Sequence, residues 1–493
     1  MRDRYVDARR WWQFKTIFMK EKESIQDRMF SDIRDNSLFE KAESFGLEYL
    51  KNAQDRHVFP HKNDLDNLRE FDERMPETSG NAHEILDLLN EFGSPATVSQ
   101  VGGRYFGFVN GSVVPAGLVA KNLSIFWDQN TAMQVISPIS SKLETIVQEW
   151  LIELFGLPSK TVAGFVSGTS MANLCGLLAA RYRILRNNDW DITEKGLFGA
   201  PKIRIVTSKH AHSTVLKTVS MAGLGKGNIE WVDADEQGRI LADRIPKLDS
   251  NTILILQAGN VNSGAFDDFS NICKKARESG AWIHIDGAFG LWAGATKRLK
   301  HLTNGFEYAH SYAVDGHKTL NTPYDSGIIL CQDEDALVSS LHMSGGYIII
   351  GEGRDGMYFT PEMSRRARVI ELWATLKYLG KEGIDEMVYG LHSRAKQFAD
   401  KLADINGFKV LNDVVFNQVI VQCETDEITN EVINKIQNDR VCWVGGSLWE
   451  GKRIIRISVC SWATTEDDVE KSVKSFKEAL EKTTEEKTAP HTV

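Results

Sequence analysis

Short apolar runs alternate with amphipathic stretches through the middle of the chain. The apolar runs predict seven strands, at residues 161–166, 203–207, 228–232, 252–257, 282–286, 308–314 and 327–331. Helical spacing separates several of them; Leu174, Leu177 and Leu178, for example, fall on one face of residues 171–183. This alternation predicts βαβ units and a mainly parallel, seven-stranded sheet with helices on both faces. Ligands of such sheets bind beyond the carboxyl ends of the strands.

The segments on either side of this region have different patterns. Residues 1–105 are charged and helix-like, with breaks at Pro60, Pro76 and residues 93–95. From residue 361 the pattern predicts helices at 364–380 and 384–405, strands at 408–411, 418–422 and 454–459, and a closing helix from Thr465. We therefore expect an α/β protein with a helical N-terminal segment at 1–105, a large domain at 106–360, a smaller α/β domain at 361–480 and a flexible tail at 481–493.

Composition narrows the functional classes. Of the 493 residues, 42% are hydrophobic and 25% are charged, which is usual for a folded globular protein. The 58 basic and 67 acidic side chains leave a net charge of −9 with no long basic stripe, so we expect no nucleic-acid partner. No apolar run reaches the length of about 18 residues that spans a membrane, and the N-terminus is charged throughout, unlike a secretory signal. We therefore expect a cytoplasmic protein.

The cysteines and the N-terminal aromatic residues add two further expectations. The six cysteines lie at least 18 positions apart and form no CxxC pair or Cys/His cluster with metal-ligand spacing. We expect free thiols in a reducing compartment and no metal site. The N-terminal stripe that includes Trp11 and Trp12 predicts an amphipathic helix that packs on a partner surface, with a membrane-surface helix or a transit segment as the alternative.

Four groups of polar residues follow predicted strands and carry the candidate chemistry. The first is Ser167-Gly168-Thr169-Ser170, where small residues, hydroxyls and a helix N-terminus can hold an anion such as phosphate. The same residues can instead serve as an ordinary helix cap. The second is His212, within Ala211-His212-Ser213-Thr214, which is either a functional or a structural histidine.

The third and fourth groups supply an acid and a lysine. His284 and Asp286 lie on one face of the strand at 282–286, and Asp286 stands at its end, where ionisation is costly without a cationic partner. Its alternative role is a capping or salt-bridged aspartate. Lys318 follows the strand at 308–314 within Asp315-Gly316-His317-Lys318, and the alternative there is a surface lysine.

One cofactor would use all four groups. Pyridoxal phosphate needs an anion cradle, a lysine that forms a Schiff base, an acid at the pyridine nitrogen and a flat partner for its ring. The acid keeps the ring nitrogen protonated, which stabilises a carbanion, and the lysine must be neutral before it can attack a carbonyl. The order cradle, ring partner, acid and lysine along the chain therefore predicts a pyridoxal-phosphate enzyme.

The chain resembles the group II pyridoxal-phosphate-dependent decarboxylases, which include the aromatic amino acid, tyrosine and glutamate decarboxylases. The stretches that carry this resemblance are GRYFGFVNGS (103–112), SPISSKLETIVQEWL (137–151), VSGTSMANLCGLLAAR (166–181), KHAHSTV (209–215), HIDGAFG (284–290), YAVDGHKTLNTPYDSG (312–327), TPEMSRRARVIELW (360–373) and RIIRISVCSWATTEDDVE (453–470). The resemblance as a whole covers about residues 40 to 480, and HIDGAFG and DGHKTLN are its most specific stretches.

The resemblance implies a type I pyridoxal-phosphate fold and an obligate homodimer with the active site near the subunit interface, in which the N-terminal helices clasp the partner subunit. It implies that Lys318 forms the Schiff base, that His317, Thr169 and Ser170 bind the phosphate, that Asp286 pairs with the pyridine nitrogen, and that His212 and Ala288 lie on the two faces of the ring. Asn262 lies where close relatives often have a Thr-rich segment. It is a candidate for a hydrogen bond to the pyridoxal hydroxyl, or a plain loop residue.

The loop that should carry the catalytic tyrosine departs from the family pattern. Counting back from Arg365 and Arg366, the tyrosine position of the aromatic-type enzymes falls on Gly356. Tyr358 lies two residues away, Tyr347 lies further, and we favour Tyr358 as the acid that protonates Cα. If neither tyrosine reaches the cofactor, protonation at Cα is in doubt and aldehyde formation becomes an alternative outcome.

The predicted function is the decarboxylation of an L-amino acid to the amine and CO2. We expect the substrate amine to displace Lys318 and the pocket to draw on Tyr105, Phe106 and Phe108, unless these aromatic residues belong to the core. The alternatives are an aldehyde synthase, an aldolase-type carbon–carbon lyase or a transaminase on the same fold, and more distantly a scaffold without the cofactor.

Overall fold

The computed structural model describes residues 24–342 and 353–488 of the chain and divides it into two units, Met1–Val98 and Ser99–Val493. The predicted helix around Trp11 and Trp12 lies outside the described residues. The first unit ends before the domain boundary expected at residue 105, and the predicted division into domains stays a prediction. No helix among the described residues is long and apolar enough to cross a membrane.

The first unit is helical, as its charged pattern predicts. Its elements are α2 (Ile25–Asp32), α3 (Asn36–Asn52), α4 (Lys62–Asp66), η1 (Asn67–Phe71), α5 (Ala82–Leu88) and η2 (Leu89–Gly93). Side-chain caps start three of these helices: Ser24 for α2, Asp35 for α3 and Asn81 for α5. No residue within these elements is buried. The described part of this unit therefore has no helix that buries an apolar face.

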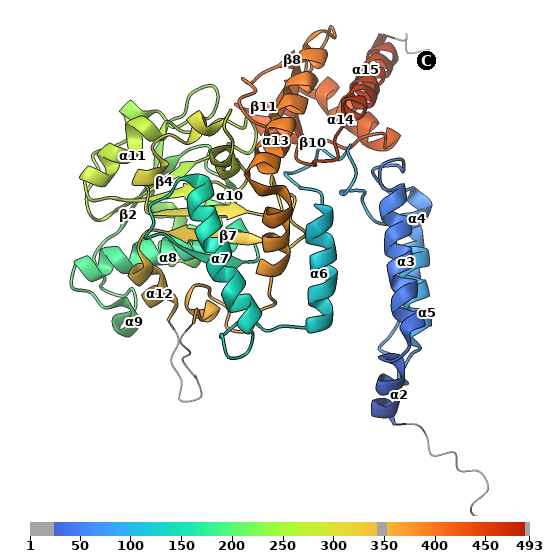
Figure 1. Ribbon diagram of the computed structural model, residues 1–493. Coiled ribbons are helices and arrows are strands. Elements are labelled where there is room, and N and C mark those ends of the chain that lie inside the picture. The colour runs from blue at the N-terminus through green and yellow to red at the C-terminus, as the bar shows by residue number, and fades with distance from the viewer. Residues whose placement is uncertain (1–23, 343–352, 489–493) are drawn as a thin grey trace, which may run out of the picture. The chain divides into compact units, whose positions relative to one another are not determined.

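The second unit is built around a seven-stranded sheet (Figure 1). Its strands are β1 (Val162–Val166), β2 (Arg204–Ser208), β3 (Ile229–Val232), β4 (Thr252–Gln257), β5 (Trp282–Asp286), β6 (Ser311–Asp315) and β7 (Gly327–Cys331). Their order is β1-β7-β6-β5-β4-β2-β3. The strands from β6 to β3 are parallel, whereas β7 pairs antiparallel with both β6 and β1. The predicted strands and the mainly parallel sheet are confirmed.

Helices cover both faces of this sheet because the strands are apolar on both sides. In β4, Ile253 and Ile255 face one core cluster, and Leu254 and Leu256 face the other. The first cluster includes residues of α8 (Thr169–Asn187), α10 (Ser213–Met221) and α12 (Glu334–Leu341). The second includes residues of α7 (Pro138–Phe155), α11 (Phe269–Glu278), the short helix η5 (Gly290–Ala295) and the start of α13 (Val369–Ala403). This is the predicted α/β class with a type I pyridoxal-phosphate architecture.

The C-terminal part has a separate core and sheet. Strands β8 (Lys409–Val410), β9 (Gln418–Gln422), β10 (Gly445–Trp449) and β11 (Lys452–Ser458) form an antiparallel sheet in the order β10-β11-β9-β8. Helices α14 (Asp426–Asp439) and α15 (Glu466–Thr488) pack against it (Figure 1). Strand β10 was not predicted because Gly445, Gly446 and Ser447 give it no apolar alternation.

Two predicted helix boundaries in this part differ from the structure. The helices predicted at 364–380 and 384–405 form one helix, α13, which kinks at Gly380 where φ is 58° and begins only at Val369. The closing helix α15 is capped by Thr465, whose hydroxyl accepts a hydrogen bond from the backbone N–H of Asp468. It continues to Thr488, so residues 481–488 of the predicted flexible tail are helical.

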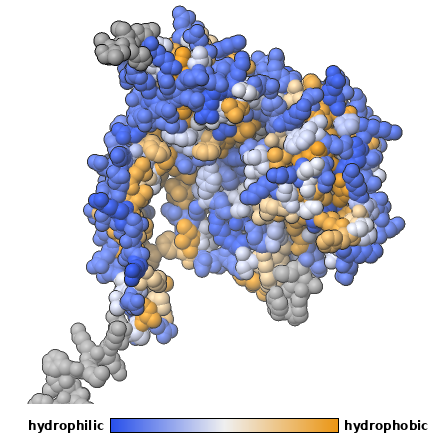
Figure 2. Space-filling view, turned by 180° about the vertical axis from the view of Figure 1, so that it is seen from behind, coloured by the Kyte–Doolittle hydropathy of each residue, from blue (hydrophilic) through white to orange (hydrophobic). Residues whose placement is uncertain are grey.

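Hydrophobic side chains also gather on the surface (Figure 2). On α6 (Pro115–Trp127), Val119, Leu123 and Ile125 are each more than half exposed. Exposed apolar side chains on one helix are typical of a surface that binds another protein.

Candidate active site

The carboxyl ends of β1, β5 and β6 place three of the predicted groups in one region. Strand β1 leads through Ser167 and Gly168 into α8, whose first residue is Thr169. The Thr169 hydroxyl oxygen is buried and has no hydrogen-bond partner among the described residues, and Ser170 is exposed. A buried hydroxyl at the positive end of a 19-residue helix is well suited to hold an anion.

Lys318 follows β6 and is held by an aspartate. Its Nζ lies 3.0 Å from Oδ2 of Asp315, whose side chain is only 2% exposed. The other carboxylate oxygen of Asp315 accepts a hydrogen bond of 2.7 Å from the backbone N–H of Thr169. Asp315 therefore connects the lysine to the anion cradle, and the surface-lysine alternative does not hold for Lys318.

Asp315 is a residue that the sequence interpretation missed. Its place was visible, because it ends a mostly apolar strand and precedes Lys318 by three residues, as Asp286 ends its own strand. We weighed only the histidine and the lysine of the Asp315-Gly316-His317-Lys318 motif.

His317 lies beside the same carboxylate. Its Nδ1 accepts a 3.0 Å hydrogen bond from the backbone N–H of Ser326, and its Nε2 lies 3.6 Å from Asp315. Burial lowers the pKa of His317, which favours the neutral ring. With Nδ1 as the acceptor, the remaining proton is on Nε2 and faces Asp315. The ring of Tyr324 stacks on His317 with the centroids 4.3 Å apart.

Asp286 ends β5 in a buried position. Strands β5 and β6 are parallel neighbours, and Asp286 pairs in register with Ala313, two residues before Asp315. Burial raises the pKa of Asp286, and the nearby His212 and Lys318 oppose that rise. Its Oδ1 accepts a 3.2 Å hydrogen bond from the backbone N–H of Ala288.

His212 has the structural role that the sequence left open, and its functional role stays a prediction. As the N-cap of α10, its Nδ1 lies 3.3 Å from the backbone nitrogen of Thr214 and 2.7 Å from that residue's hydroxyl. Burial lowers its pKa, while the carboxylate of Asp286 acts in the opposite direction. His212 is thus a structural cap that also lies within electrostatic range of Asp286 and Lys318.

The loop after β4 contributes Asn262. Its backbone N–H donates a 2.9 Å hydrogen bond to the side chain of Asn260, which is ordinary loop geometry. Its own Oδ1 is buried and has no hydrogen-bond partner among the described residues. Both readings of Asn262 therefore remain open, and the buried acceptor is suited to a hydroxyl donor.

Arg456 of β11 is a second residue that the sequence interpretation missed, although it lies in the quoted RIIRIS stretch. Burial lowers its pKa, and its charge acts on both His212 and Tyr105. The hydrogen bond found for its guanidinium is a long one, 3.4 Å from Nη1 to the carbonyl oxygen of Val261. Arg456 is therefore a partly desolvated cation near the site.

Of the three aromatic residues expected in the pocket, Tyr105 and Phe108 both stack on Trp443, whereas Phe106 belongs to the core. Tyr105 is buried, stacks on Trp443 with the centroids 5.3 Å apart and lies within electrostatic range of Arg456. Phe106 is fully buried in the core of the C-terminal part, which is the alternative that we considered for it. Phe108 is 61% exposed.

The loop after residue 352 does not bring Tyr358 to the other candidate residues. Its ring stacks on His342 with the centroids 5.6 Å apart and packs against the cluster formed by Ala132, Met133 and Met357. No contact joins Tyr358 to Lys318. Its role as the proton donor stays a prediction, and Tyr347 lies outside the described residues.

Gly356 is enclosed by a buried ion-pair network. A Cβ atom at this position would overlap Nη2 of Arg365 and lie 2.9 Å from the carbonyl oxygen of Thr131 and 3.0 Å from Glu144. Arg365 and Glu144 form an ion pair of 2.7 Å with side chains only 2% and 1% exposed. The position that holds tyrosine in the aromatic-type pattern therefore has no room for a side chain in this fold.

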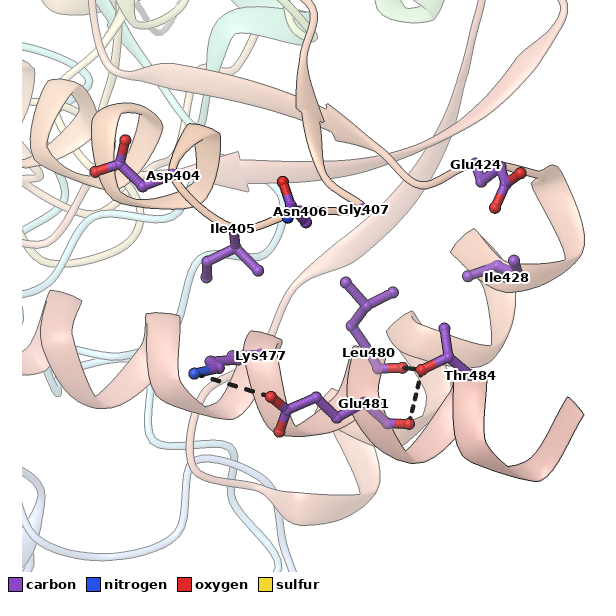
Figure 3. Close-up of a pocket in the computed structure, with 10 residues that line it drawn as sticks. All are labelled: Asp404, Ile405, Asn406, Gly407, Glu424, Ile428, Lys477, Leu480, Glu481 and Thr484. Atoms are coloured by element: carbon purple, nitrogen blue, oxygen red, sulfur yellow. Dashed lines mark hydrogen bonds and ion pairs between the residues drawn. The ribbon is translucent and has the colours of Figure 1, made fainter. Parts of the chain in front are cut away.

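A cavity of about 360 Å³ lies elsewhere, in the C-terminal part between the ends of α13, α14 and α15 (Figure 3). Leu480 points into the space near Ile405 and Ile428, and Lys477 pairs with Glu481 at 3.8 Å. None of the candidate site residues lines this cavity. No group of three or more His, Cys, Asp or Glu side chains that could hold a metal occurs among the residues that the structure describes.

The candidate residues fit pyridoxal phosphate on structural grounds. The buried, unpartnered hydroxyl of Thr169 and the helix N-terminus suit the phosphate, and the unpartnered Oδ1 of Asn262 suits the ring hydroxyl. Asp286 supplies a buried carboxylate and Lys318 supplies an amine at the neighbouring strand end. Such a set of groups would hold an aldehyde cofactor, and the cofactor would supply the electron sink for a bound substrate.

Comparisons with known proteins agree with this geometry. Residues 68–423 match the family model described as the pyridoxal-dependent decarboxylase conserved domain. The chain is 26% identical over 399 residues to an aromatic-L-amino-acid decarboxylase of Bacillus atrophaeus, covering 76% of this chain and 79% of that one. It is 22% identical over 427 residues to a phenylacetaldehyde synthase of Arabidopsis thaliana, covering 80% and 85%. A solved structure of Oryza sativa TDC with PLP and tryptamine superimposes with a TM-score of 0.83 at 21% identity, covering 93% of this chain and 98% of that one.

Proposed function

Because the chain belongs to the pyridoxal-dependent decarboxylase family and is a carboxy-lyase that uses pyridoxal 5'-phosphate, we propose that it converts an L-amino acid to the amine and CO2 with Lys318 as the covalent attachment residue. The observation that carries this proposal is the buried arrangement of Lys318, Asp315 and Asp286 at the carboxyl ends of β5 and β6. Parallel sheets bind their ligands at this edge.

The described contacts support several of the residues that we propose to hold the cofactor. The backbone and hydroxyls of Thr169 and Ser170, together with His317, would bind the phosphate. Asp286 would face the ring nitrogen, while His212 and Ala288 would lie on the two faces of the ring. Pyridoxal phosphate supplies an electron sink for the bond pair that is left at Cα when CO2 departs.

The protein's own groups control the charges in this site. Burial raises the pKa of Asp286, and the nearby His212 and Lys318 oppose that rise. Lys318 would have to give up its proton before bonding to an aldehyde, and the carboxylate of Asp315 lies 3.0 Å from its Nζ. Arg456 offers a cation for the substrate carboxylate as it enters.

An aldehyde-forming reaction is the second candidate, and the enclosure of Gly356 favours it. In an amine-forming decarboxylase an acid must protonate Cα, and the aromatic-type tyrosine position cannot hold a side chain here. Without that proton, the electron pair at Cα could pass to O2, which with two protons would become peroxide, and water would then cleave the oxidised C–N bond to give the aldehyde and ammonia. The similarity to a phenylacetaldehyde synthase fits the same alternative.

We also propose that the protein is a cytoplasmic homodimer with its active site near the subunit interface. The exposed apolar residues Val119, Leu123 and Ile125 on α6 support an interface with a second copy. Light scattering coupled to size-exclusion chromatography tests this, since a monomer at working concentrations would contradict it.

A panel of L-amino acids offered to the purified protein tests the reaction. We expect CO2 and an equal amount of amine from at least one of them, with an absorbance band of lysine-bound cofactor that borohydride removes. Aldehyde with ammonia and peroxide in place of the amine would support the second candidate. Persistence of the absorbance band in Lys318→Ala would refute the assignment of the lysine.

A further inference from the structure

A chain of buried polar side chains runs along one face of β5 and ends at Asp286. Trp282, His284 and Asp286 alternate along the strand and share the face that α8 covers. The indole N–H of Trp282 donates a 3.0 Å hydrogen bond to the hydroxyl oxygen of Ser311. The same oxygen lies 2.8 Å from Nδ1 of His284, and Nε2 of His284 lies 2.8 Å from Oδ1 of Asn173. We call Trp282, Ser311, His284 and Asn173 the β5 polar chain; each is at most 3% exposed.

Elementary donor and acceptor chemistry gives this chain one direction. An indole N–H can only donate, so the Ser311 oxygen accepts from Trp282. Burial lowers the pKa of His284 to about 3, so the ring is neutral and carries one proton. The amide oxygen of Asn173 can only accept, so that proton is on Nε2, and Nδ1 accepts from the Ser311 hydroxyl.

The carboxylate of Asp286 accounts for this orientation of the Asn173 amide. With its oxygen facing His284, the NH2 group of Asn173 is turned to the other side, toward Asp286. The amide lies close enough to Asp286 to lower the pKa of that carboxyl, although Nδ2 is not within hydrogen-bonding distance of any partner among the described residues. The opposite orientation would place a carbonyl oxygen against a carboxylate, which is repulsive.

The fold makes room for the chain at one glycine. A Cβ atom on Gly176 of α8 would lie 2.6 Å from both Nδ1 and Cε1 of His284 and 3.2 Å from the hydroxyl oxygen of Ser311. Any side chain at this position would displace the histidine. A helix interior disfavours glycine relative to alanine by about 1 kcal/mol, so the space behind His284 is maintained at some cost to the helix.

We propose that the β5 polar chain fixes the Asn173 amide with its NH2 group toward Asp286, and thereby holds this carboxylate ionised for the ring nitrogen of the cofactor. Asn173 is then a positioning residue that acts through Asp286. Ser311 is the first residue of β6, at the opposite end of that strand from the candidate site, and it acts through His284 and Asn173. This inference rests on the role proposed above for Asp286.

The contribution of the ring nitrogen can be measured without turnover. Full-length apoprotein is titrated with pyridoxal 5'-phosphate and with its 1-deaza analogue, which has a carbon in place of the ring nitrogen, and the ratio of the two dissociation constants is determined. We expect the wild-type protein to bind the nitrogen-containing cofactor more tightly. Asn173→Ala should reduce this preference by about tenfold, because the amide NH2 group turned toward the Asp286 carboxylate is lost.

Ser311→Ala tests whether the chain sets the amide from a distance. Without the hydroxyl, the tautomer of His284 is no longer fixed, so the preference for the nitrogen-containing cofactor should fall several-fold. The double variant Ser311→Ala/Asn173→Ala should match Asn173→Ala, because Ser311 acts through Asn173. Thr207→Val is the matched control: it removes another buried hydroxyl from the same sheet, which donates 2.9 Å to the carbonyl of Ile255 and is not part of the chain. That control should keep the wild-type ratio.

The outcomes separate this inference from the proposed function. A wild-type protein that binds both cofactors equally would refute the role of Asp286 and, with it, the inference. A wild-type preference that survives in folded Ser311→Ala and Asn173→Ala proteins would refute the inference alone. Additive losses in the double variant would show that Ser311 does not act through Asn173 and would also overturn it.

Discussion

Replacing Gly356 with alanine should destabilise the protein strongly. The added Cβ atom would overlap Nη2 of Arg365 and would lie 2.9 Å from the carbonyl oxygen of Thr131. A contact this short requires Arg365 to move, and its side chain is only 2% exposed. The movement would break the 2.7 Å ion pair between Arg365 and Glu144.

The magnitude follows from the burial of this pair. Breaking a buried ion pair by displacing one partner costs roughly 3–5 kcal/mol, because a charge remains buried without its counter-ion. Glu144 would keep a second partner, since Arg354 lies 3.0 Å from its other oxygen. We therefore expect a loss of about 3 kcal/mol in the free energy of unfolding, at the lower end of that range.

Urea denaturation followed by tryptophan fluorescence measures this loss. Gly390→Ala is a matched control, because a Cβ atom on Gly390 of α13 would meet no other atom within 4 Å. That change should be neutral or stabilising by up to about 1 kcal/mol, since alanine is the better helix former. If Gly356→Ala unfolds at the same urea concentration as Gly390→Ala, position 356 has room for a side chain and the argument for its enclosure fails.

Three further predictions concern two carboxylates, Asp315 and Asp267, and one arginine, Arg456. Asp315→Asn should bind pyridoxal 5'-phosphate more tightly but pyridoxal no more tightly, because it removes a negative charge beside the proposed phosphate site; fluorescence titration of the apoprotein checks both. Burial raises the pKa of Asp267 from 3.8 to about 6, so this carboxyl keeps its proton to a higher pH in the native state than in the unfolded state. About 3 kcal/mol of stability should therefore be lost as the pH rises from 4 to above 6. Urea denaturation at both ends of this pH range should show the loss in the wild type, relative to Asp267→Asn. Arg456→Gln should raise KM more than it lowers kcat, as steady-state CO2 release would show, if Arg456 binds the substrate carboxylate.

The main sheet could be predicted because its strands are continuous apolar runs. Residues 252–257 (TILILQ) face a core cluster on each side, so no polar residue interrupts the pattern, and the predicted and observed strands coincide. Strand β10 was not predicted because it is stabilised by pairing with β11, and the alternation of residues along the sequence does not report this pairing. The late start of α13 has a similar cause, since Arg365 and Arg366 bind the carboxylates of Glu144 and Asp325.

The candidate site could be predicted only in part from the sequence, for a related reason. Lys318 and Asp286 stand at strand ends, where sequence order and the parallel sheet place them together. Asp315 and Asn173 contact elements that are far apart from them in the chain. Asp315, for example, accepts a 2.7 Å hydrogen bond from the backbone N–H of Thr169 at the start of α8. Spacing along a sequence carries no direct information about such contacts.

The source of the Cα proton decides which product the proposed reaction yields. Gly356 has no room for an acid, and Tyr358 contacts His342 and the Met133 cluster. We propose Lys318 as the donor instead, because its amine would become free within the site if a substrate amine displaced it. The carboxylate of Asp315 forms an ion pair of 3.0 Å with this amine. An ammonium group held in this way can deliver a proton to Cα, so an amine product requires no tyrosine at position 356.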